Sequence, residues 1–238
     1  MAASRCETRL KTSIIIPLFG PEHFLTACLS AITDNTEGDY DVIVVDNATG
    51  YDLSGAPNLA AIVRNKENLG FAVACNQGAK CSKSEILCFL NVDTEVQPGW
   101  LPNLLTAFDD PEVVMAGPRI VHPAGDLQTA GLHLWHGSGS AGGQEIKEDL
   151  PSRDVDGVTG ACMMIRCKEF FVLGMFDTDF QNGYEDCALC MSATEAGYRI
   201  RYVAESQITH WESAAGGTDR WANAGRNVET MNRKWGNR

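Results

Sequence analysis

Residues 86–95 read ILCFLNVDTE, and this stretch decides the fold class that we expect. Its first half, Ile86–Leu90, is an uninterrupted apolar run of strand length, which predicts a short buried strand. The second half is polar and acidic, and Gln97-Pro98-Gly99 then breaks the chain before a helical pattern resumes. Ligands of open α/β sheets bind beyond the carboxyl ends of the strands, so Asp93 and Glu95 would lie where a ligand binds.

Two interpretations of these acidic residues are open at this point. Carboxylates at positions i and i+2 of an extended segment could share a hard cation such as Mg²⁺ or Mn²⁺. Alternatively, Asp93 and Thr94 could cap a helix, where acidic residues are also favoured by the helix dipole. The stretch by itself favours the helix start, and the rest of the chain has to decide.

The pattern of an apolar run followed by polar residues recurs through the first ninety residues. Further apolar, β-branched runs occur at 13–17, 42–45 and 62–64, with helical spacing of apolar residues at 24–32 and small residues over 70–80 between them. This alternation predicts an α/β fold with a doubly wound, mostly parallel central sheet flanked by helices. The predicted strand ends carry Asp46, Asn47, Asn91 and Asp93. Turn chemistry accounts for any one of them, but four at successive strand ends favour a binding site.

The second half of the chain predicts a smaller, partly antiparallel portion. We expect a helix after Pro98, a strand at 113–117, a β-rich passage to Trp135, a strand over 158–165, a helix over 184–196 and a half-exposed strand from Tyr198. Residues 137–142 match the dinucleotide motif G-x-G-x-x-G, but that motif must open a packed helix. Residues 144–151 are short, charged and end in proline, so we reject dinucleotide binding. We expect residues 136–156 to form a mobile loop that could act as an active-site flap.

Composition narrows the functional classes. The 238 residues are 44% hydrophobic and 21% charged, as in ordinary soluble globular proteins. A formal net charge of −12 argues against nucleic-acid binding, although a metal could still create a local anion site. The nine cysteines are scattered through apolar segments, and the single C-x-x-C pair at 187–190 has no second pair, so we expect buried reduced thiols. With no signal peptide or membrane-spanning run, we expect a cytoplasmic location.

A second acidic site precedes the helix expected at 184–196. Asn182 and Glu185 have the spacing of a capping box, which gives Glu185 a structural role and leaves Asp186 unassigned. A carboxylate in the first turn of a helix is stabilised in its charged form and is ready to accept a proton. His210 follows a predicted strand. A lone histidine is usually a packed or surface residue, but a ring nitrogen could join a carboxylate in binding Mg²⁺ or Mn²⁺.

The C-terminal segment has its own pattern, and we divide the chain into a domain of residues 1–215 and an amphipathic helical tail of residues 216–238. Trp221, Val228, Met231 and Trp235 lie on one helical stripe, and basic residues outnumber acidic ones. Most such tails pack on their own domain. The alternative is peripheral contact with an anionic membrane, here the inner membrane face, or with a lipid diphosphate.

Several short motifs occur in a fixed order between residues 12 and 212. They are SIIIP at 13–17, VDNA at 45–48, NLGFA at 68–72 with NQG at 76–78, LNVDTE at 90–95, GACM at 160–163, GMFD at 174–177, YED at 184–186, AGY at 196–198, and His210. In this order they closely resemble the inverting nucleotide-sugar glycosyltransferases of family 2, which have a GT-A fold. The subgroup that the chain looks most like contains rhamnosyl- and galactofuranosyl-transferase-like enzymes of bacterial surface polysaccharide assembly.

The resemblance implies a role for each matching residue. Nucleotide contacts fall on Pro17, Asp46, Asn47, Arg64, Asn68, Gly70, Asn91 and Val92. Asp93 matches the last residue of the family's D-x-D metal motif, and His210 matches a further metal ligand. Asp186 matches the catalytic base, with Glu185 beside it, and Gly160, Ala161 and Trp211 fall in the sugar and acceptor pocket. Asn91 replaces the first acid of D-x-D, so metal binding would depend on Asp93, His210 and the diphosphate, with the role of Glu95 open.

The implied function is a metal-dependent, inverting hexosyl transfer. The donor would be a UDP-, dTDP- or GDP-sugar, the acceptor a hydroxyl of a saccharide or lipid-linked molecule, and the cofactor Mn²⁺ or Mg²⁺. One alternative is a non-catalytic nucleotide-sugar or glycan-binding protein on the same scaffold, which Asn91 motivates. A sugar-phosphate nucleotidyltransferase ranks last, because the segment after the first strand, residues 17–22, has one glycine and no arginine.

Overall fold

The computed structural model describes residues 10–212 and 223–238. Strands and helices alternate through the first part as the sequence predicts: β1 (Thr12–Leu18), α1 (Glu22–Asn35), β2 (Tyr40–Asn47), β3 (Leu59–Asn65), α2 (Phe71–Cys81) and β4 (Ile86–Leu90). There follow β5 (Thr94–Val96), α3 (Trp100–Leu105), the 3₁₀ helix η1 (Thr106–Asp109), β6 (Val113–Val121), β7 (Leu127–Thr129), β8 (Leu132–Trp135), β9 (Gly142–Glu145), β10 (Arg153–Val155), β11 (Cys162–Arg166), α4 (Cys167–Val172), α5 (Glu185–Glu195), β12 (Arg199–His210) and α6 (Ala224–Trp235).

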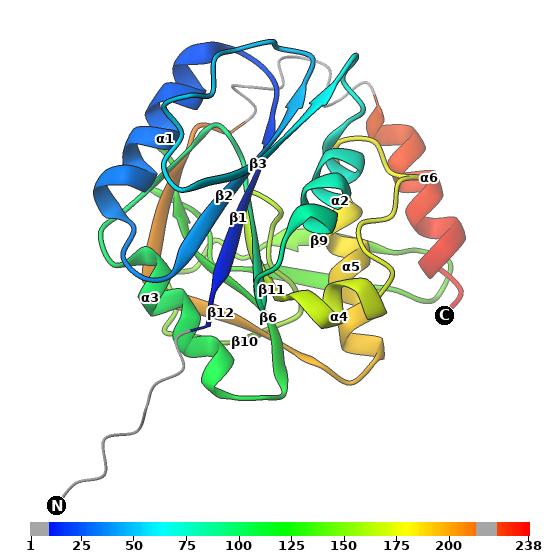
Figure 1. Cartoon of the computed structure of the whole chain (residues 1–238). Helices are drawn as coiled ribbons and strands as arrows, with labels where there is room; N and C mark the ends of the chain where they lie inside the picture. The colour runs from blue at the N-terminus through cyan, green and yellow to red at the C-terminus, as the bar shows by residue number, and fades with distance from the viewer. Residues whose placement is uncertain (1–9, 213–222) are drawn as a thin grey trace, which may run out of the picture.

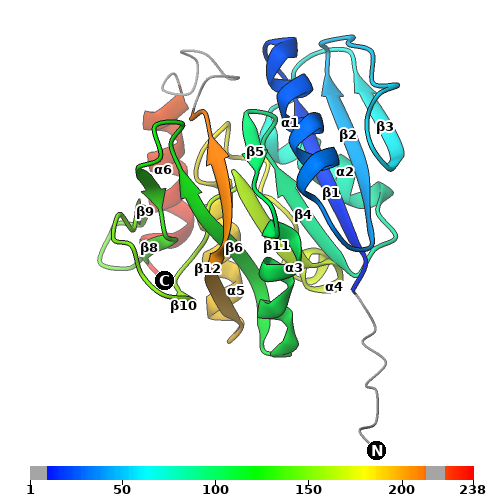
Figure 2. The same ribbon diagram turned by 90° about the vertical axis from the view of Figure 1, so that its left-hand side faces the viewer.

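The central sheet has the order β10-β12-β6-β11-β4-β1-β2-β3. Strands β3, β2, β1 and β4 run parallel, β11 is antiparallel to both of its neighbours, and β12 runs parallel to β6. Helices α1 and α3 cover one face of this sheet, and α2, α4 and α5 cover the other (Figures 1 and 2). The expected α/β fold, with a mostly parallel sheet and a small antiparallel portion, is therefore confirmed.

The β-branched run of β1 explains why both faces are covered. Ile14 and Ile16 belong to the apolar core beneath α1 and α3, whereas Ile15 belongs to the core beneath α2, α4 and α5. All three side chains are fully buried. Side chains of successive residues in a strand point to opposite faces of the sheet. A strand that is apolar at every position therefore requires a helical layer on each face.

Residues 94–96 do not start a helix. They form β5, in which Glu95 is paired with Thr209 and Thr94 with His210 of β12. The helix begins only at Trp100, after Gly99 with φ of 77°. The helix-start interpretation of Asp93 and Thr94 is therefore wrong, because pairing with a distant strand satisfies this backbone instead.

Residues 136–156 are also more ordered than the sequence predicts. β8 and β9 form an antiparallel hairpin whose connection holds the glycine motif except for its last residue, Gly142, which begins β9, and β10 pairs with β12. No helix follows the motif, which agrees with the rejection of dinucleotide binding. Gly143 lies against Leu134 and Cys187, so that a Cβ there would fall 2.7 Å and 2.9 Å from their side chains. Close packing on α5 orders a segment whose local composition is that of a loop.

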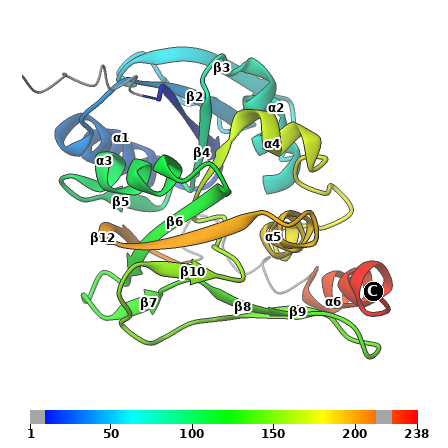
Figure 3. The same cartoon turned by 90° about the horizontal axis from the view of Figure 1, so that it is seen from below.

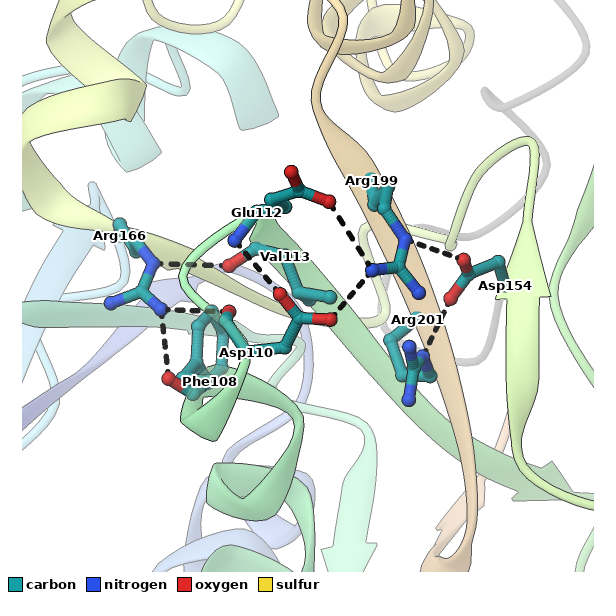
Figure 4. A network of polar contacts seen from close by, with 8 residues as sticks. All are labelled: Phe108, Asp110, Glu112, Val113, Asp154, Arg166, Arg199 and Arg201. Atoms are coloured by element: carbon teal, nitrogen blue, oxygen red, sulfur yellow. Dashed lines mark hydrogen bonds and ion pairs between the residues drawn. The ribbon is translucent and has the colours of Figure 1, made fainter.

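An ion-pair network fastens β10 to the rest of the sheet (Figure 4). Arg199 pairs with Asp110 at 2.6 Å and with Asp154 at 2.7 Å, and Arg201 pairs with Asp154 at 2.6 Å. Burial raises the pKa of the Asp154 carboxyl, but hydrogen bonds from both arginines outweigh burial and leave the pKa below its usual value. The segment after the hairpin is thus held to β12 through Asp154, the middle residue of β10.

The C-terminal helix α6 packs on the domain. Met231 and Trp235 are buried in one cluster with Phe180, Cys187 and Met191, and Figure 3 shows α6 beside α5 and the β8–β9 hairpin. Trp221, which we placed on the same stripe, lies outside the described residues, and Val228 is 39% exposed. Within the described ranges, no helix combines the length and the apolar character that crossing a membrane requires.

The cysteines of the described ranges are all unpaired, as the sequence predicts. Most are buried, including Cys187 and Cys190 of the C-x-x-C pair, while Cys81 is exposed. Burial raises the pKa of the Cys187 and Cys190 thiols, which favours the protonated form over the thiolate.

Candidate active site

A pocket of about 300 Å³ opens at the carboxyl ends of β1, β2 and β4. It brings together most of the residues singled out from the sequence: Pro17, Asn47, Asn68, Asn91, Val92, Asp93, Gly160, Ala161, Glu185, Asp186 and His210. The pocket also contains residues that the sequence did not assign to a binding site: Phe19, Phe71, Gln128, Glu145, Thr159, Asn182, Gly183 and Glu212. Asp46, Arg64, Gly70 and Trp211 do not line it.

Asp46 is buried behind the pocket and holds the loop after β2. Its carboxylate accepts hydrogen bonds from Thr49 N (2.7 Å), Thr49 Oγ1 (2.7 Å) and Gly50 N (3.1 Å), and it pairs with Arg64 at 2.6 Å. Burial raises the pKa of Asp46, but these hydrogen bonds outweigh burial and leave the pKa below its ordinary value. In this structure Asp46 and Arg64 therefore organise the neighbourhood of Asn47, which lines the pocket, rather than facing the pocket themselves.

Gly70 and Asn182 build the start of α2. Gly70 has φ of 81°, a conformation that favours glycine, and its N–H donates to Asn68 Oδ1 at 2.9 Å. Asn182 Oδ1 accepts a hydrogen bond from Phe71 N at 3.1 Å, so this side chain serves α2 and not its own helix. The capping-box prediction for Asn182 is therefore wrong, and Tyr184, the residue at the cap position of α5, makes no side-chain capping hydrogen bond.

Glu185 does reach back along the chain, though to a different partner. Its Oε2 accepts a hydrogen bond from Gly183 N at 2.6 Å, and only 4% of the residue is exposed. Asn182, Gly183 and Tyr184 have positive φ values of 53°, 152° and 73°. This run of unusual backbone conformations turns the Asn182 side chain away from α5, which local sequence spacing does not reveal.

Asp186 sits in the first turn of α5 with its carboxylate anchored on both sides. Oδ2 accepts a hydrogen bond from Gly160 N at 2.9 Å, and Oδ1 accepts one from Cys187 N at 2.8 Å. Gly160 and Ala161 precede β11, which begins at Cys162, so the strand predicted from residue 158 starts later than expected. The turn formed by 160–161 places a backbone donor against Asp186 and fixes the orientation of this carboxylate in the pocket.

Asp93 and His210 meet at the base of the pocket. His210 Nε2 lies 3.4 Å from Asp93 Oδ1, and the two residues are only 6% and 4% exposed. His210 Nδ1 lies 3.1 Å from Gln128 Oε1 of β7. In the neutral ring, a proton on Nδ1 donates to that oxygen and leaves the Nε2 lone pair facing Asp93. Two lone-pair donors at this distance suit a shared cation.

Glu95 and Trp211 pair with each other beside the pocket. Trp211 Nε1 donates to Glu95 Oε1 at 3.0 Å, and Trp211 N donates to the backbone oxygen of Asp93 at 2.9 Å. The indole is 42% exposed and lies 6.4 Å, centroid to centroid, from the Phe24 ring. The Glu95 carboxylate thus orients an exposed aromatic ring near the pocket.

The lining of the pocket is strongly acidic. Its titratable members among the described residues are Asp93, Glu145, Glu185, Asp186, Glu212 and His210, with neither lysine nor arginine. Within the same residues, no group of three or more His, Cys, Asp or Glu side chains is arranged to hold a metal by itself. An anionic ligand entering this pocket would require a cation to offset the carboxylates, and that cation would need ligand atoms beyond Asp93 and His210.

Comparison with known proteins agrees with these features. The family model described as Glycosyl transferase family 2 matches residues 13–171. The pre-mycofactocin glycosyltransferase of Mycobacterium tuberculosis is 30% identical over 209 residues, which cover 82% of this chain and 44% of that protein. The chain spans less than half the length of the first curated relatives that it matches.

Two solved structures show the same fold at 18% sequence identity. A crystal structure of GalNAc-T7 with UDP, GalNAc and Mn²⁺ has a TM-score of 0.72 and covers 94% of this chain and 48% of that one. The mannosyltransferase PcManGT from Pyrobaculum calidifontis, in complex with GDP-Man and Mn²⁺, has a TM-score of 0.69 and covers 95% of this chain and 64% of that one. The expected GT-A fold is confirmed.

Proposed function

The chain belongs to glycosyl transferase family 2, and from that premise we propose that it transfers a sugar from a nucleotide-diphosphate sugar to an acceptor hydroxyl. The observation that carries the proposal is that a fixed carboxylate, Asp186, and the buried pair of Asp93 and His210 line one pocket. A proton acceptor and a cation-binding pair in one cavity are what such a displacement needs.

We propose a single displacement with inversion at the anomeric carbon. An acceptor hydroxyl is a weak nucleophile, so Asp186 takes its proton while the oxygen forms a bond to the anomeric carbon. The bond from that carbon to the diphosphate oxygen breaks, and its electron pair leaves with the nucleoside diphosphate. Hydrogen bonds from Gly160 N and Cys187 N hold the Asp186 carboxylate in place throughout the step.

We propose Mn²⁺ or Mg²⁺ as the cofactor, held by Asp93 and His210 together with oxygens of the diphosphate. The acidic lining supports a cation cofactor, since no lysine or arginine among the described residues lines the pocket to pair with the phosphates. The cation supplies charge neutralisation of the diphosphate as that group leaves. Gln128 orients His210 through the contact of its Oε1 with His210 Nδ1.

The nucleoside is expected at the end of the pocket formed by Pro17, Asn47 and Asn68. Asp46 and Arg64 support this end through the loop after β2. Gly160 and Ala161 line the sugar and acceptor end. We extend this end to Trp211, because an exposed indole held by Glu95 offers an apolar face to a sugar ring.

We propose that the donor is a UDP-, dTDP- or GDP-sugar, including the rhamnosyl or galactofuranosyl types of the subgroup that the motifs resemble. The acceptor is a saccharide or a lipid-linked saccharide of surface polysaccharide assembly. Peripheral membrane contact through the tail is less favoured, because Lys234 pairs with Asp177 and Asp179, and Arg238 pairs with Glu195. These contacts support a tail that packs on its own domain.

A donor screen tests the proposal. The melting temperature is measured with UDP-, dTDP- and GDP-sugars, each with Mn²⁺, Mg²⁺ or a chelator. A matching donor present at 100 times its Kd stabilises the fold by about 2.7 kcal/mol. Release of nucleoside diphosphate from the donors that shift the melting temperature then separates an enzyme from a binding protein. Binding without turnover on any acceptor or on water would support the non-catalytic alternative, and no metal-dependent shift at all would contradict the site.

A further inference from the structure

Helix α6 touches two separate segments that line the pocket. One is the segment from Gln181 to Asp186, which enters α5 and carries Asn182, Gly183, Glu185 and the base. The other is the β8–β9 hairpin, whose last residue, Glu145, also lines the pocket. Neither contact follows from the roles assigned above, because α6 itself contributes no residue to the pocket.

One buried side chain of α6, Asn227, forms hydrogen bonds with the first segment. Its Oδ1 accepts a hydrogen bond from Gln181 N at 3.1 Å, and its Nδ2 donates to Gln181 O at 2.9 Å. Asn227 is only 1% exposed. An amide that satisfies both backbone groups of one residue holds that residue as a strand neighbour would, although the segment belongs to no sheet.

The contact with Gln181 matters because the residues that follow Gln181 lead directly to Asp186. The next three residues all have positive φ, and Gly183 N donates to Glu185 Oε2. Asp186 follows directly, in the first turn of α5. A backbone path with three unusual conformations is maintained only if its surroundings determine it. The hydrogen bonds of Asn227 hold Gln181 at the start of this path, and the hydrogen bond from Phe71 N holds Asn182, the next residue.

The helix is itself firmly placed. Met231 and Trp235 are buried against α5, and Lys234 pairs with Asp177 at 2.5 Å and with Asp179 at 2.7 Å. On its other side, Asn232 Oδ1 accepts a hydrogen bond from Ala141 N at 2.8 Å, and Gly139 N donates to Gly236 O at 2.8 Å. The hairpin and the segment that carries Asp186 are thus both bonded to α6 and the residue that follows it.

We propose that Asn227 is a positioning residue for catalysis: through Gln181 it fixes the path of residues 181–186 and so the placement of Asp186 in the pocket. The inference rests on the proposed glycosyl transfer, because Asp186 is a base only in that reaction. Asn227 touches neither donor nor acceptor and acts through the backbone that it holds.

The experiment compares Asn227→Ala with Asn237→Ala, which makes the same chemical change at an exposed position beyond the end of α6. Three quantities are measured on the full chain: the rate of nucleoside diphosphate release from the donors found by the screen, the Kd for UDP or GDP with Mn²⁺, and hydrogen exchange of residues 179–186. Rates are expressed per nucleotide-binding site, which removes any unfolded fraction from the comparison.

We expect Asn227→Ala to lower kcat by at least about tenfold, since small misplacements of a catalytic group are costly. The Kd for the nucleotide should change by no more than about twofold, because uniform binding through Pro17, Asn47 and Asn68 is retained. Hydrogen exchange over 179–186 should accelerate. Asn227→Asp keeps the acceptor for Gln181 N, but it places a buried carboxylate oxygen against Gln181 O where the donor was, so its kcat should fall at least as far as that of Asn227→Ala. Asn237→Ala should match the wild type.

A lower melting temperature with unchanged kcat per binding site would overturn the proposal and leave Asn227 as a stabilising residue only. Unchanged exchange over 179–186 would overturn it as well. If the wild type releases nucleoside diphosphate from no donor, the proposed function fails, and the exchange data still report separately whether Asn227 holds the segment.

Discussion

His210 Nε2 and Asp93 Oδ1 lie 3.4 Å apart at the base of an acidic pocket, on residues 117 positions apart in the sequence. β5 and β12 bring them together, because Thr94 is paired with His210 in the antiparallel ladder. The pairing of β5 with β12 therefore excludes a helix start at Asp93 and Thr94 and also brings together the two residues of the proposed cation site.

Removing either member of this pair should weaken the metal-dependent binding of the nucleotide. For His210→Ala and Asp93→Asn we expect the Mn²⁺-dependent part of the affinity for UDP or GDP to fall by about 10- to 100-fold or more, as for other changes around metal ligands. Calorimetric titration with and without Mn²⁺ measures this. His133→Ala, at an exposed histidine, is the control. Equal metal dependence in wild type and His210→Ala would exclude this histidine as a ligand.

Asp186→Asn should separate chemistry from binding. Loss of a general base costs about 10²- to 10⁴-fold in rate, so we expect kcat to fall in that range while the Kd for the nucleotide diphosphate with Mn²⁺ stays close to that of the wild type. The new amide can accept from only one of Gly160 N and Cys187 N, so a lower melting temperature should accompany the change.

Asp126→Asn makes the same substitution at an exposed aspartate and should change neither kcat nor melting temperature. A fully active Asp186→Asn enzyme would place the base elsewhere. Glu145, Glu185 and Glu212, which also line the pocket, would then be the next carboxylates to replace.

Asp46 should make stability depend on pH in the acid range. Its pKa is lowered in the folded chain from an ordinary value of 3.8. A lowered carboxyl pKa stabilises the fold above the unfolded value, and this contribution is lost as the pH falls through the lower, folded value. In urea unfolding, Asp46→Asn should therefore be destabilised relative to wild type at pH 7, with a smaller difference below about pH 3.8. The same difference at both pH values would contradict the assignment.

The packing of α2 on the sheet predicts a paired glycine experiment. A Cβ on Gly78 would lie 2.4 Å from Ile15 Cγ2 and 3.2 Å from Val45 Cγ2. Overpacking of this kind costs about 1–3 kcal/mol, so Gly78→Ala should lower the free energy of unfolding by that amount. A Cβ on Gly225, in α6, would meet no atom outside its own helix backbone within 4 Å, and Gly225→Ala should be neutral or stabilising by up to about 1 kcal/mol. Chemical denaturation of the two variants measures both effects, and equal outcomes would mean that α2 can shift.

Much of the fold could be predicted because it depends on near neighbours in the chain. The β4 prediction agrees with the structure at both ends, and β1, β2, α1 and α2 agree to within a few residues. Apolar periodicity records which faces are buried, and burial on both faces of β1 is enough to require a helical layer on each side. The errors fall where packing overrides local pattern: Thr94 pairs with a distant strand, and residues 136–156 are ordered against α5.

For the site, the sequence by itself determined the identities of the chemical groups: Asp93, Asp186 and His210 were singled out from motifs, and all three line one pocket. Only the tertiary structure decided what their neighbours do. Asn182 serves Phe71 N, 111 residues away, Trp211 binds Glu95 at a separation of 116, and Asn227 holds Gln181 at a separation of 46. The reason is physical: a side chain's type and periodicity are local properties, whereas its hydrogen-bond partner is whichever unsatisfied group the packed fold places within about 3 Å.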